Sequence, residues 1–177
     1  MEYIDILDEK GNKTDVVKEY EEVHKKGLWH EGVHVWLINS KKEILLQYRS
    51  KNKRNYPSMW DISAAGHVSS GENPATSAIR ETKEEIGVDI SVEELKKIGR
   101  IVQQGVFNNG IYIDNEYDNI YLVVKNLDIN EFKISADEVQ KLKWVPIPLF
   151  KQWVQEKKPD IVPHLEYVIL FEALNYL

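Results

Sequence analysis

One stretch, GHVSSGENPATSAIRETKEEIGV at residues 66–88, constrains the fold of this chain more than any other, because it marks both ends of a helix. Asn73 is a favoured N-cap residue, Pro74 suits the first helical position, and Gly87 suits the residue just past the last turn. These markers predict a helix over residues 74–86. The stripe expected to face the core consists of Ala75, Ile79, Thr82 and Ile86.

Three acids share another face of this predicted helix. Glu81, Glu84 and Glu85 are spaced so that they fall within roughly 100° of one another around the helix axis. Like charges at such spacings cost about 0.2–0.5 kcal/mol per pair, and a divalent cation relieves that repulsion. Mg²⁺ commonly binds one or two carboxylates together with substrate phosphates. A solvated acidic face is the alternative, and the three acids alone favour it because such faces are common.

The spacing within the stretch favours the metal site. Gly66 is followed after five residues by Glu72, and after seven more by the run RETKEEIGV at residues 80–88. This pattern resembles the Nudix box, G-x5-E-x7-R-E-U-x-E-E-x-G-U, in which U is aliphatic. All seven fixed positions match. Thr82 departs from an aliphatic position, but it lies on the inward stripe, so the departure affects packing more than chemistry.

The resemblance implies an α/β/α sandwich with a mixed sheet, in which the box forms a loop–helix–loop and residues 1–177 form a single Nudix domain. It also implies metal-dependent hydrolysis of a pyrophosphate linkage, with Mg²⁺ or Mn²⁺ held by Glu81, Glu84 and Glu85. Arg80 is then expected to orient a glutamate through a bidentate pair, with an ordinary surface ion pair as the alternative. Glu72 is expected to cap the loop or to support the ligands from outside.

The resemblance extends to the Nudix branch related to isopentenyl-diphosphate isomerase. It is carried by VHKKGLWHEGVHVWLIN and by LLQYRSKNKRNYPSMWDISAAGHVSSGE, and it covers most of residues 3–146. In the isomerases, histidines and later acids bind a divalent metal. The resemblance therefore implies a metal site whose ligands include His30 and His67, and the matching positions are His24, His30, His67, Asp114 and Glu116.

Ala65 separates this chain from the isomerases, which carry a catalytic Cys at that position. The chain contains no Cys at all, and a methyl group cannot pass a proton. The isomerases also lack part of the acidic set of the box, which is intact here. Both differences favour hydrolysis over isomerisation.

The general base stays open between three acids, Glu84, Glu116 and Glu138. With Glu85 and Arg80, Glu84 and Glu116 form the predicted catalytic group. His34 alternates with valines on a predicted strand, and a hydrogen-bonded strand histidine is favoured there over a metal ligand.

The segment RSKNKR at residues 49–54 is the one concentrated positive patch of the sequence. We expect Arg49 and Lys53 to bind the diphosphate, since guanidinium and ammonium groups recognise phosphates. A solvated loop without a function is the alternative.

The remaining chain alternates short strands and helices, which predicts a mixed sheet with helices on both faces. Hydrophobic runs and turn residues predict strands near residues 3–7, 14–17, 33–38, 44–48, 60–63, 100–107, 111–124 and 143–146. Helices are expected near residues 18–26, 147–156 and 163–175, and one or two helical turns over residues 92–97, closed by Gly99.

Composition narrows the function classes. A net charge of −6 argues against an electrostatically bound nucleic-acid polymer, and the absence of Cys excludes disulfides and thiol catalysis. Without an apolar run of membrane length or a signal pattern, we expect a cytoplasmic protein that binds no membrane. The expected partner is a small-molecule diphosphate, and a homodimer is left open. Three functions remain: a hydrolase of a nucleoside diphosphate derivative, which we favour, an isopentenyl-diphosphate isomerase, and a non-catalytic diphosphate-binding module.

Overall fold

The strand β3 (His30–Ile38) lies at the centre of a seven-stranded mixed sheet in this computed structural model, which describes residues 2–176. It pairs in parallel with β8 (Tyr112–Val124) and antiparallel with β6 (Ala64–His67). Alternate residues of a strand point to opposite faces of the sheet, so β3 contributes to two separate layers.

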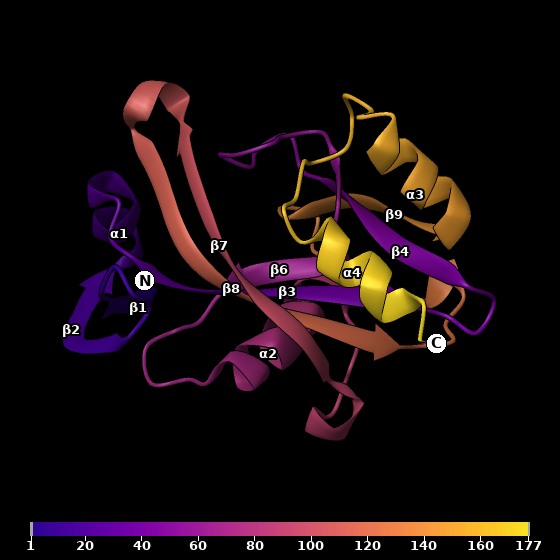
Figure 1. Cartoon of the computed structure of the whole chain (residues 1–177), viewed down its shortest axis with the longest axis horizontal. Coiled ribbons are helices and arrows are strands. Elements are labelled where there is room, and N and C mark those ends of the chain that lie inside the picture. The colour runs from indigo at the N-terminus through magenta and orange to yellow at the C-terminus, as the bar shows by residue number, and fades with distance from the viewer. Residues whose placement is uncertain (1, 177) are drawn as a thin grey trace.

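The other strands extend the sheet on both sides of β3. On one side β7 (Lys96–Phe107) pairs with β8, and the hairpin of the two projects beyond the sheet (Figure 1). On the other side β4 (Glu43–Arg49) pairs with β5 (Trp60–Asp61) and β9 (Val139–Pro146). The N-terminal segment forms its own two-stranded sheet and a short helix, namely β1 (Tyr3–Leu7), β2 (Lys13–Glu19) and α1 (Tyr20–Lys26).

Helices cover both faces of the sheet. Val33, Val35 and Leu37 of β3 pack in one core cluster with Ala78 and Ile86 of α2 (Pro74–Ile86). The intervening residues, Trp36 and Ile38, pack in a second cluster with α3 (Ile147–Gln155) and α4 (Tyr167–Leu174). In Figure 1, α3 and α4 accordingly lie on one side of β3 and α2 on the other. The predicted α/β/α sandwich with a mixed sheet is confirmed.

β3 and β4 form a hairpin that is paired at one position only, Ile38 with Ile44 beside the turn. Beyond that pair β3 continues with β6 and β8, whereas β4 continues with β5 and β9. The two strands therefore diverge, and the ends farthest from the turn, at His30 and Arg49, border an open end of the sheet.

The helix of the box begins and ends as predicted, at Pro74 and Ile86. Asn73 Oδ1 accepts a hydrogen bond from the Thr76 amide at 3.0 Å, which caps the first turn. Gly87 adopts a left-handed conformation with φ 73°, and a Cβ there would lie 2.7 Å from the Lys133 carbonyl oxygen. A side chain at position 87 would therefore be strained by the left-handed backbone and would also clash with Lys133.

The bounds of two predicted elements were wrong. Lys18 and Glu19 belong to β2, so the first helix begins only at Tyr20. The expected helical turn is present as a single 3₁₀ turn, Val92–Glu94, but Lys96 and Lys97 already belong to β7, and Gly99 lies inside that strand rather than at the end of the turn. In both places residues that favour a helix are paired in a strand instead, because strand pairing outweighs local helix propensity.

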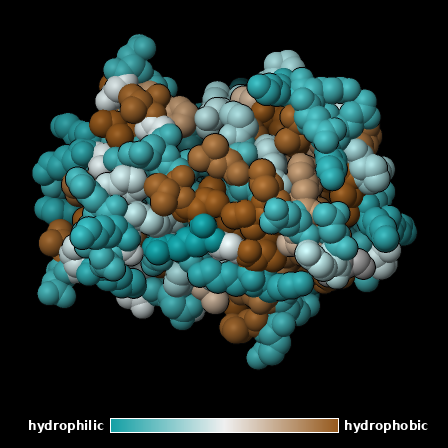
Figure 2. All heavy atoms as spheres, viewed as in Figure 1, coloured by the Kyte–Doolittle hydropathy of each residue, from teal (hydrophilic) through white to brown (hydrophobic). Residues whose placement is uncertain are grey.

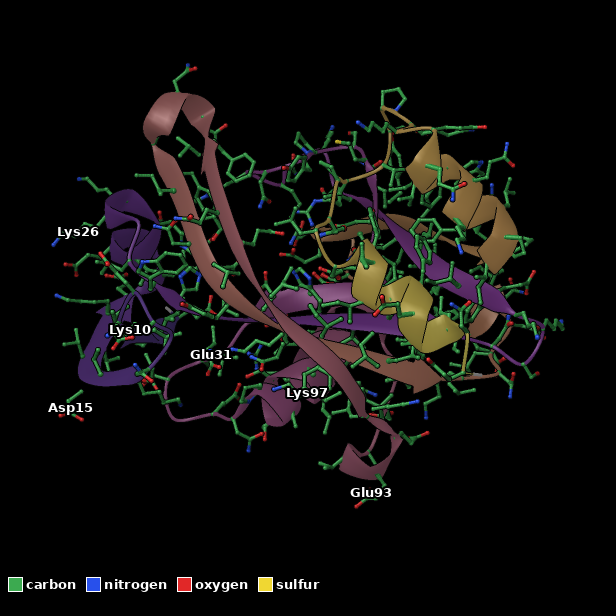
Figure 3. All side chains as sticks on the ribbon, viewed as in Figure 1. Lys10, Asp15, Lys26, Glu31, Glu93 and Lys97 are labelled. Carbon is green, nitrogen blue, oxygen red and sulfur yellow. The ribbon has the colours of Figure 1, made fainter. Side chains whose placement is uncertain are left out.

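The outer surface carries both charged and apolar side chains. Asp15 and Lys26 point outward from the N-terminal elements (Figure 3). Apolar side chains gather over α4 and the neighbouring part of the sheet (Figure 2), where Leu165, Val168 and Val102 are exposed. Within residues 2–176 no helix is both long enough and apolar enough to cross a membrane.

Candidate functional site

A cleft of about 890 Å³ lies at the open end of the sheet. Its walls come from β6, from the acids of α2, from the carboxylates of β8 and from the segment that follows β4. This volume falls within the range of small-molecule sites, about 300–1,000 Å³. The predicted site residues Arg49, Lys53, His67, Arg80, Glu81, Glu84, Glu85 and Glu116 all line it.

Glu85 is the most buried acid of α2. Its Oε2 accepts hydrogen bonds from Gln47 Nε2 at 2.9 Å and from the Ala65 amide at 3.1 Å, and its Oε1 lies 3.7 Å from Lys53 Nζ. Burial raises the pKa of Glu85, while the charge of Lys53 opposes that rise. The donors hold one carboxylate oxygen in place and leave the other close to the cleft.

Glu81 lies directly against the backbone of Gly66. A Cβ at position 66 would lie 2.1 Å from Cδ of Glu81, so a side chain there would displace this carboxylate. Burial raises the pKa of Glu81 to about 8; the charge of Arg80 opposes the rise and that of Glu85 adds to it. A cation beside Glu81 would favour its ionised form. Glu84, one turn from Arg80, is the exposed member of the set.

Arg80 connects the acids of the box. Its Nη1 donates to Glu81 Oε1 at 2.6 Å and to Glu84 Oε2 at 3.2 Å, while Nε and Nη2 each lie 3.2 Å from Glu72 Oε2. Glu72 Oε2 also accepts a hydrogen bond from Ser77 Oγ at 2.6 Å. These contacts are those expected of a group that orients glutamates. They are more extensive than one surface ion pair.

A second group of possible ligands adjoins the same cleft, which is lined by its members His67, Asp114 and Glu116, whereas His24 and His30 are buried next to them. One donor atom from each of His24, His30, His67 and Asp114 lies within 4.8 Å of the others. Glu116 Oε1 is 3.3 Å from His30 Nε2 and 3.5 Å from His67 Nε2. The structure therefore brings together all five residues that the isomerase resemblance implied, including His24.

The donor set of this group fits a divalent metal. Nδ1 of His24 donates to the Tyr20 carbonyl and Nδ1 of His30 to the Leu28 carbonyl, each at 2.9 Å, so the lone pairs lie on the Nε2 atoms. Within residues 2–176, both Nε2 atoms and Asp114 Oδ1 are buried without a hydrogen-bond partner. Ligating histidines are usually fixed through their other ring nitrogen in this way.

The pKa values in this group reflect burial first and the crowding of like charges second. Burial lowers the pKa of His67 well below its usual value, and the neighbouring His30 and His24 lower it further. Burial likewise raises the pKa of Glu116 well above its usual value, and the neighbouring Asp114 adds to that rise. Neutral imidazoles are the form that binds metal ions.

Strand register explains how these residues meet. β3 and β8 pair His30 with Glu116 and Gly32 with Asp118, so alternate side chains of the two strands form adjacent rows on one face. β6 pairs His67 with Gly32, which places the third histidine beside the same row. A Cβ on Gly32 would lie 2.1 Å from Asp118 Oδ1, so a side chain there would displace the acid.

The alternative of a solvated loop at residues 49–54 is wrong for Arg49 and Lys53. Arg49 ends β4 and is buried, and its Nη1 donates to Asp61 Oδ2 at 2.6 Å. Its Nη2 donates to Asn55 Oδ1 at 2.7 Å. Lys53 is hydrogen-bonded to Glu138 and also faces Glu85. Both cations line the cleft, but most donors of Arg49 are already bound inside the protein.

The three candidate bases all line the cleft, in different surroundings. Glu84 pairs with Arg80, Glu138 with Lys53, and Glu116 lies among the histidines. Ala65 also lines the cleft and presents a methyl group at the position where the isomerases carry their thiol.

Sequence reasoning missed four buried or half-buried polar residues near the cleft, namely Asp61, Asp118, His164 and Glu166, of which Asp61 and His164 line it. His34 is buried and hydrogen-bonded as expected, with Nδ1 2.7 Å from Glu166 Oε2. The one available signal was the run PHLE at residues 163–166, which places a histidine and an acid between two apolar segments.

Comparisons with known proteins agree with this geometry. A family model of the NUDIX domain matches residues 28–165. Nudix hydrolase 3 of Arabidopsis thaliana is 37% identical over 180 residues, which cover 98% of this chain and 23% of that protein. The chain thus spans about a quarter of the length of this relative. Isopentenyl-diphosphate Delta-isomerase 2 of Photorhabdus laumondii is 32% identical over 153 residues, covering 86% of this chain and 79% of that protein.

Solved structures share the fold at lower identity. A crystal structure of DR0079 from Deinococcus radiodurans superposes with a TM-score of 0.69 at 16% identity, covering 99% of this chain and 98% of the other. The NUDIX domain of Shewanella oneidensis NrtR, solved with ADP ribose, superposes with a TM-score of 0.59 at 14% identity, covering 90% of this chain and 98% of the other.

Proposed function

The chain belongs to the Nudix family, and we propose that it is a metal-dependent hydrolase of the pyrophosphate linkage in a nucleoside diphosphate derivative or related organic diphosphate. One observation carries the proposal: the complete acidic set of α2 faces a cleft of substrate size together with a second group of ligands. A module that only binds its ligand has no need of this set.

We assign the metal ligands to two groups. Glu81, Glu84 and Glu85 offer oxygen donors, which suit Mg²⁺ or Mn²⁺. His24, His30, His67, Asp114 and Glu116 offer mixed nitrogen and oxygen donors, which suit Mn²⁺ or a similar ion. Divalent ions bound there supply charge neutralisation of the diphosphate and a water of lowered pKa.

The protein's own groups then have separate tasks. Arg80 orients Glu81 and Glu84, and Gln47 with the Ala65 amide orients Glu85. Lys53 places a positive charge beside Glu85, where a phosphate oxygen can accept from it. Glu84, Glu116 or Glu138 accepts the proton of the attacking water, since all three acids line the cleft.

The substrate class rests on two observations. Tyr20, Tyr56 and Tyr112 line the cleft and offer aromatic surface to a base or an apolar group. A structural neighbour binds ADP ribose, which is a nucleoside diphosphate derivative. An isopentenyl-diphosphate isomerase is the second candidate, favoured by the group around His67 and opposed by Ala65.

A substrate screen tests the proposal. The protein is incubated with Mg²⁺ or Mn²⁺ and one candidate substrate at a time, and the products are separated by chromatography. The candidates are nucleoside diphosphate sugars, ADP ribose, dinucleoside polyphosphates, nucleoside diphosphates and triphosphates, and isopentenyl diphosphate. We expect cleavage between two phosphorus atoms in at least one nucleotide, and none in Glu85→Gln. Tight binding of a diphosphate without cleavage would instead identify a binding module.

A further inference from the structure

A third group of possible ligands lies beside the cleft and is used by none of the steps above. His34 of β3 and two residues that precede α4, His164 and Glu166, offer donor atoms that all lie within 4.8 Å of one another. Glu166 Oε2 is 2.7 Å from His34 Nδ1 and 3.8 Å from His164 Nδ1. The three side chains are 8%, 6% and 0% exposed.

Each imidazole is backed by a carboxylate on its other nitrogen. His164 Nε2 lies 2.5 Å from Asp61 Oδ1, and His34 Nε2 lies 3.7 Å from Asp118 Oδ1. In the neutral form of His164, whose Nε2–H donates to Asp61, the lone pair of the ring lies on Nδ1. Within the described residues His164 Nδ1 is buried and has no hydrogen-bond partner. A carboxylate behind a histidine is the usual support of a ligating ring.

The carboxylate of the group is also held from behind. Trp36 Nε1 donates to Glu166 Oε1 at 2.8 Å, and the indole of Trp36 is fully buried. Glu166 therefore presents only Oε2 to the two imidazoles. Glu166 and His164 are thus each held by a hydrogen bond from outside the group, whereas His34 is hydrogen-bonded to Glu166 itself and has a carboxylate 3.7 Å from its Nε2.

We propose that His34 Nδ1, His164 Nδ1 and Glu166 Oε2 form a separate binding site for a first-row transition metal ion such as Zn²⁺. Two imidazoles and one carboxylate suit such ions, whereas Mg²⁺ prefers oxygen donors. His34 and His164 line the cleft, so a fourth position is open to water or to a substrate oxygen. Three protein ligands with one open position are typical of catalytic zinc sites.

The site differs from the other histidine group in the ring atoms it uses. His24 and His30 bind carbonyl oxygens through Nδ1 and present Nε2, whereas His34 and His164 face carboxylates through Nε2 and present Nδ1. The chain has five histidines, and both groups together contain all of them. Spectra of the histidine nitrogens can therefore assign each bound ion to its group.

Zinc titration of a variant in which the other group is disabled tests the proposal. In the His30→Gln/Glu116→Gln double variant we expect one equivalent of Zn²⁺ to bind. Adding His164→Gln or Glu166→Gln removes a ligand and should lower zinc affinity at least about a hundredfold, whereas Trp36→Phe, which removes only a support, should lower it about 10- to 100-fold. Circular dichroism establishes that each variant is folded.

Nitrogen-15 spectra of histidine in the unaltered chain provide a test that needs no variant. Zinc should remove the Nδ1 proton of His34 and keep the Nε2 protons of both rings. The proposal is overturned if the double variant binds no zinc, if His164→Gln and Glu166→Gln bind it unchanged, or if the His34 and His164 signals do not respond. None of these results bears on hydrolysis, which the substrate screen decides separately.

Discussion

Arg49 and Asp61 form a buried ion pair, in which Nη1 of the arginine lies 2.6 Å from Oδ2 of the aspartate. The two residues come from the paired strands β4 and β5, and Asp61 also holds His164 through its other oxygen. One carboxylate thus links the end of β4 to the segment before α4. Burial acts to raise the pKa of Asp61, but the charges of His164 and Arg49 outweigh it and lower the pKa far below its usual value.

Arg49→Ala is expected to destabilise the fold as well as any substrate binding. It leaves Asp61 buried with one cation fewer, and breaking a buried pair on one side typically costs about 3–5 kcal/mol. Urea unfolding measures the loss, and Lys51→Ala, at an exposed position of the same segment, should stay within about 0.5 kcal/mol. If Arg49→Ala unfolds like the unaltered protein while kcat/KM falls tenfold, the arginine serves substrate binding alone.

Glu85→Gln and Glu81→Gln should each lower kcat by orders of magnitude while the protein stays folded. The amide keeps the size of each side chain but removes the charge that holds a divalent ion. Turnover is measured at saturating Mg²⁺ with circular dichroism as the folding control. Glu93→Gln, at an exposed position, is the matched variant and should keep its activity. Near-normal kcat in Glu85→Gln or Glu81→Gln would show that the metal site lies elsewhere.

The stability of the metal-free protein should fall as pH rises from about 5 to 8. The pKa of Glu81 is raised from 4.5 to about 8, so across this range the unfolded chain loses a proton that the folded chain retains. Fewer protons on the unfolded state mean that unfolding becomes easier as pH rises. Mg²⁺ should reduce this slope because it favours the ionised form.

Urea unfolding at pH 5, 6.5 and 8, with and without Mg²⁺, measures this slope. Glu81→Gln is the control, because a residue that does not titrate cannot contribute to it. His34, whose pKa is raised to about 10 because Glu166 and Asp118 outweigh the effect of burial, adds a further decline above about pH 6.5 in both proteins. Equal slopes in the two proteins would show that Glu81 is ionised throughout.

Isopentenyl diphosphate should take up no deuterium from solvent in the presence of this protein and Mg²⁺. The reason is Ala65, whose methyl group cannot donate or accept the proton that isomerisation requires. Mass spectrometry or NMR of the recovered diphosphate measures incorporation at the allylic carbon. Catalysed exchange would require another acid in the cleft and would restore the isomerase as the leading function.

Features that depend on neighbouring residues were predictable from the sequence. The caps Asn73 and Gly87 fix the ends of α2, and alternating apolar residues mark β3 and β4. The spacing within the box predicted that Glu81, Glu84 and Glu85 lie on one face of α2. These features are determined by residues that are neighbours in the sequence, so they can be predicted without knowing which distant residues come into contact.

Features that depend on distant partners were not predictable. Nothing near Arg49 indicates that Asp61 will neutralise it. His164 and Glu166 lie close to β3 after Ile161, which forms an isolated bridge with Trp60 and brings the segment before α4 back to the sheet. The pairing of His30 with Glu116 depends on the register of two strands far apart in sequence, and a shift of one residue would turn every acid of β8 to the opposite face.

The parallel pairing of β3 with β8 also decides when the ligands come together as the chain folds. The two strands are separated by the box, by α2 and by β7, so their contact closes a long loop and forms slowly compared with local structure. A transition state that lacks this contact holds no ion at His30 and Glu116. Ions bound there would then slow unfolding and leave the refolding rate almost unchanged, so that the metal prolongs the lifetime of the native state without guiding the chain to it.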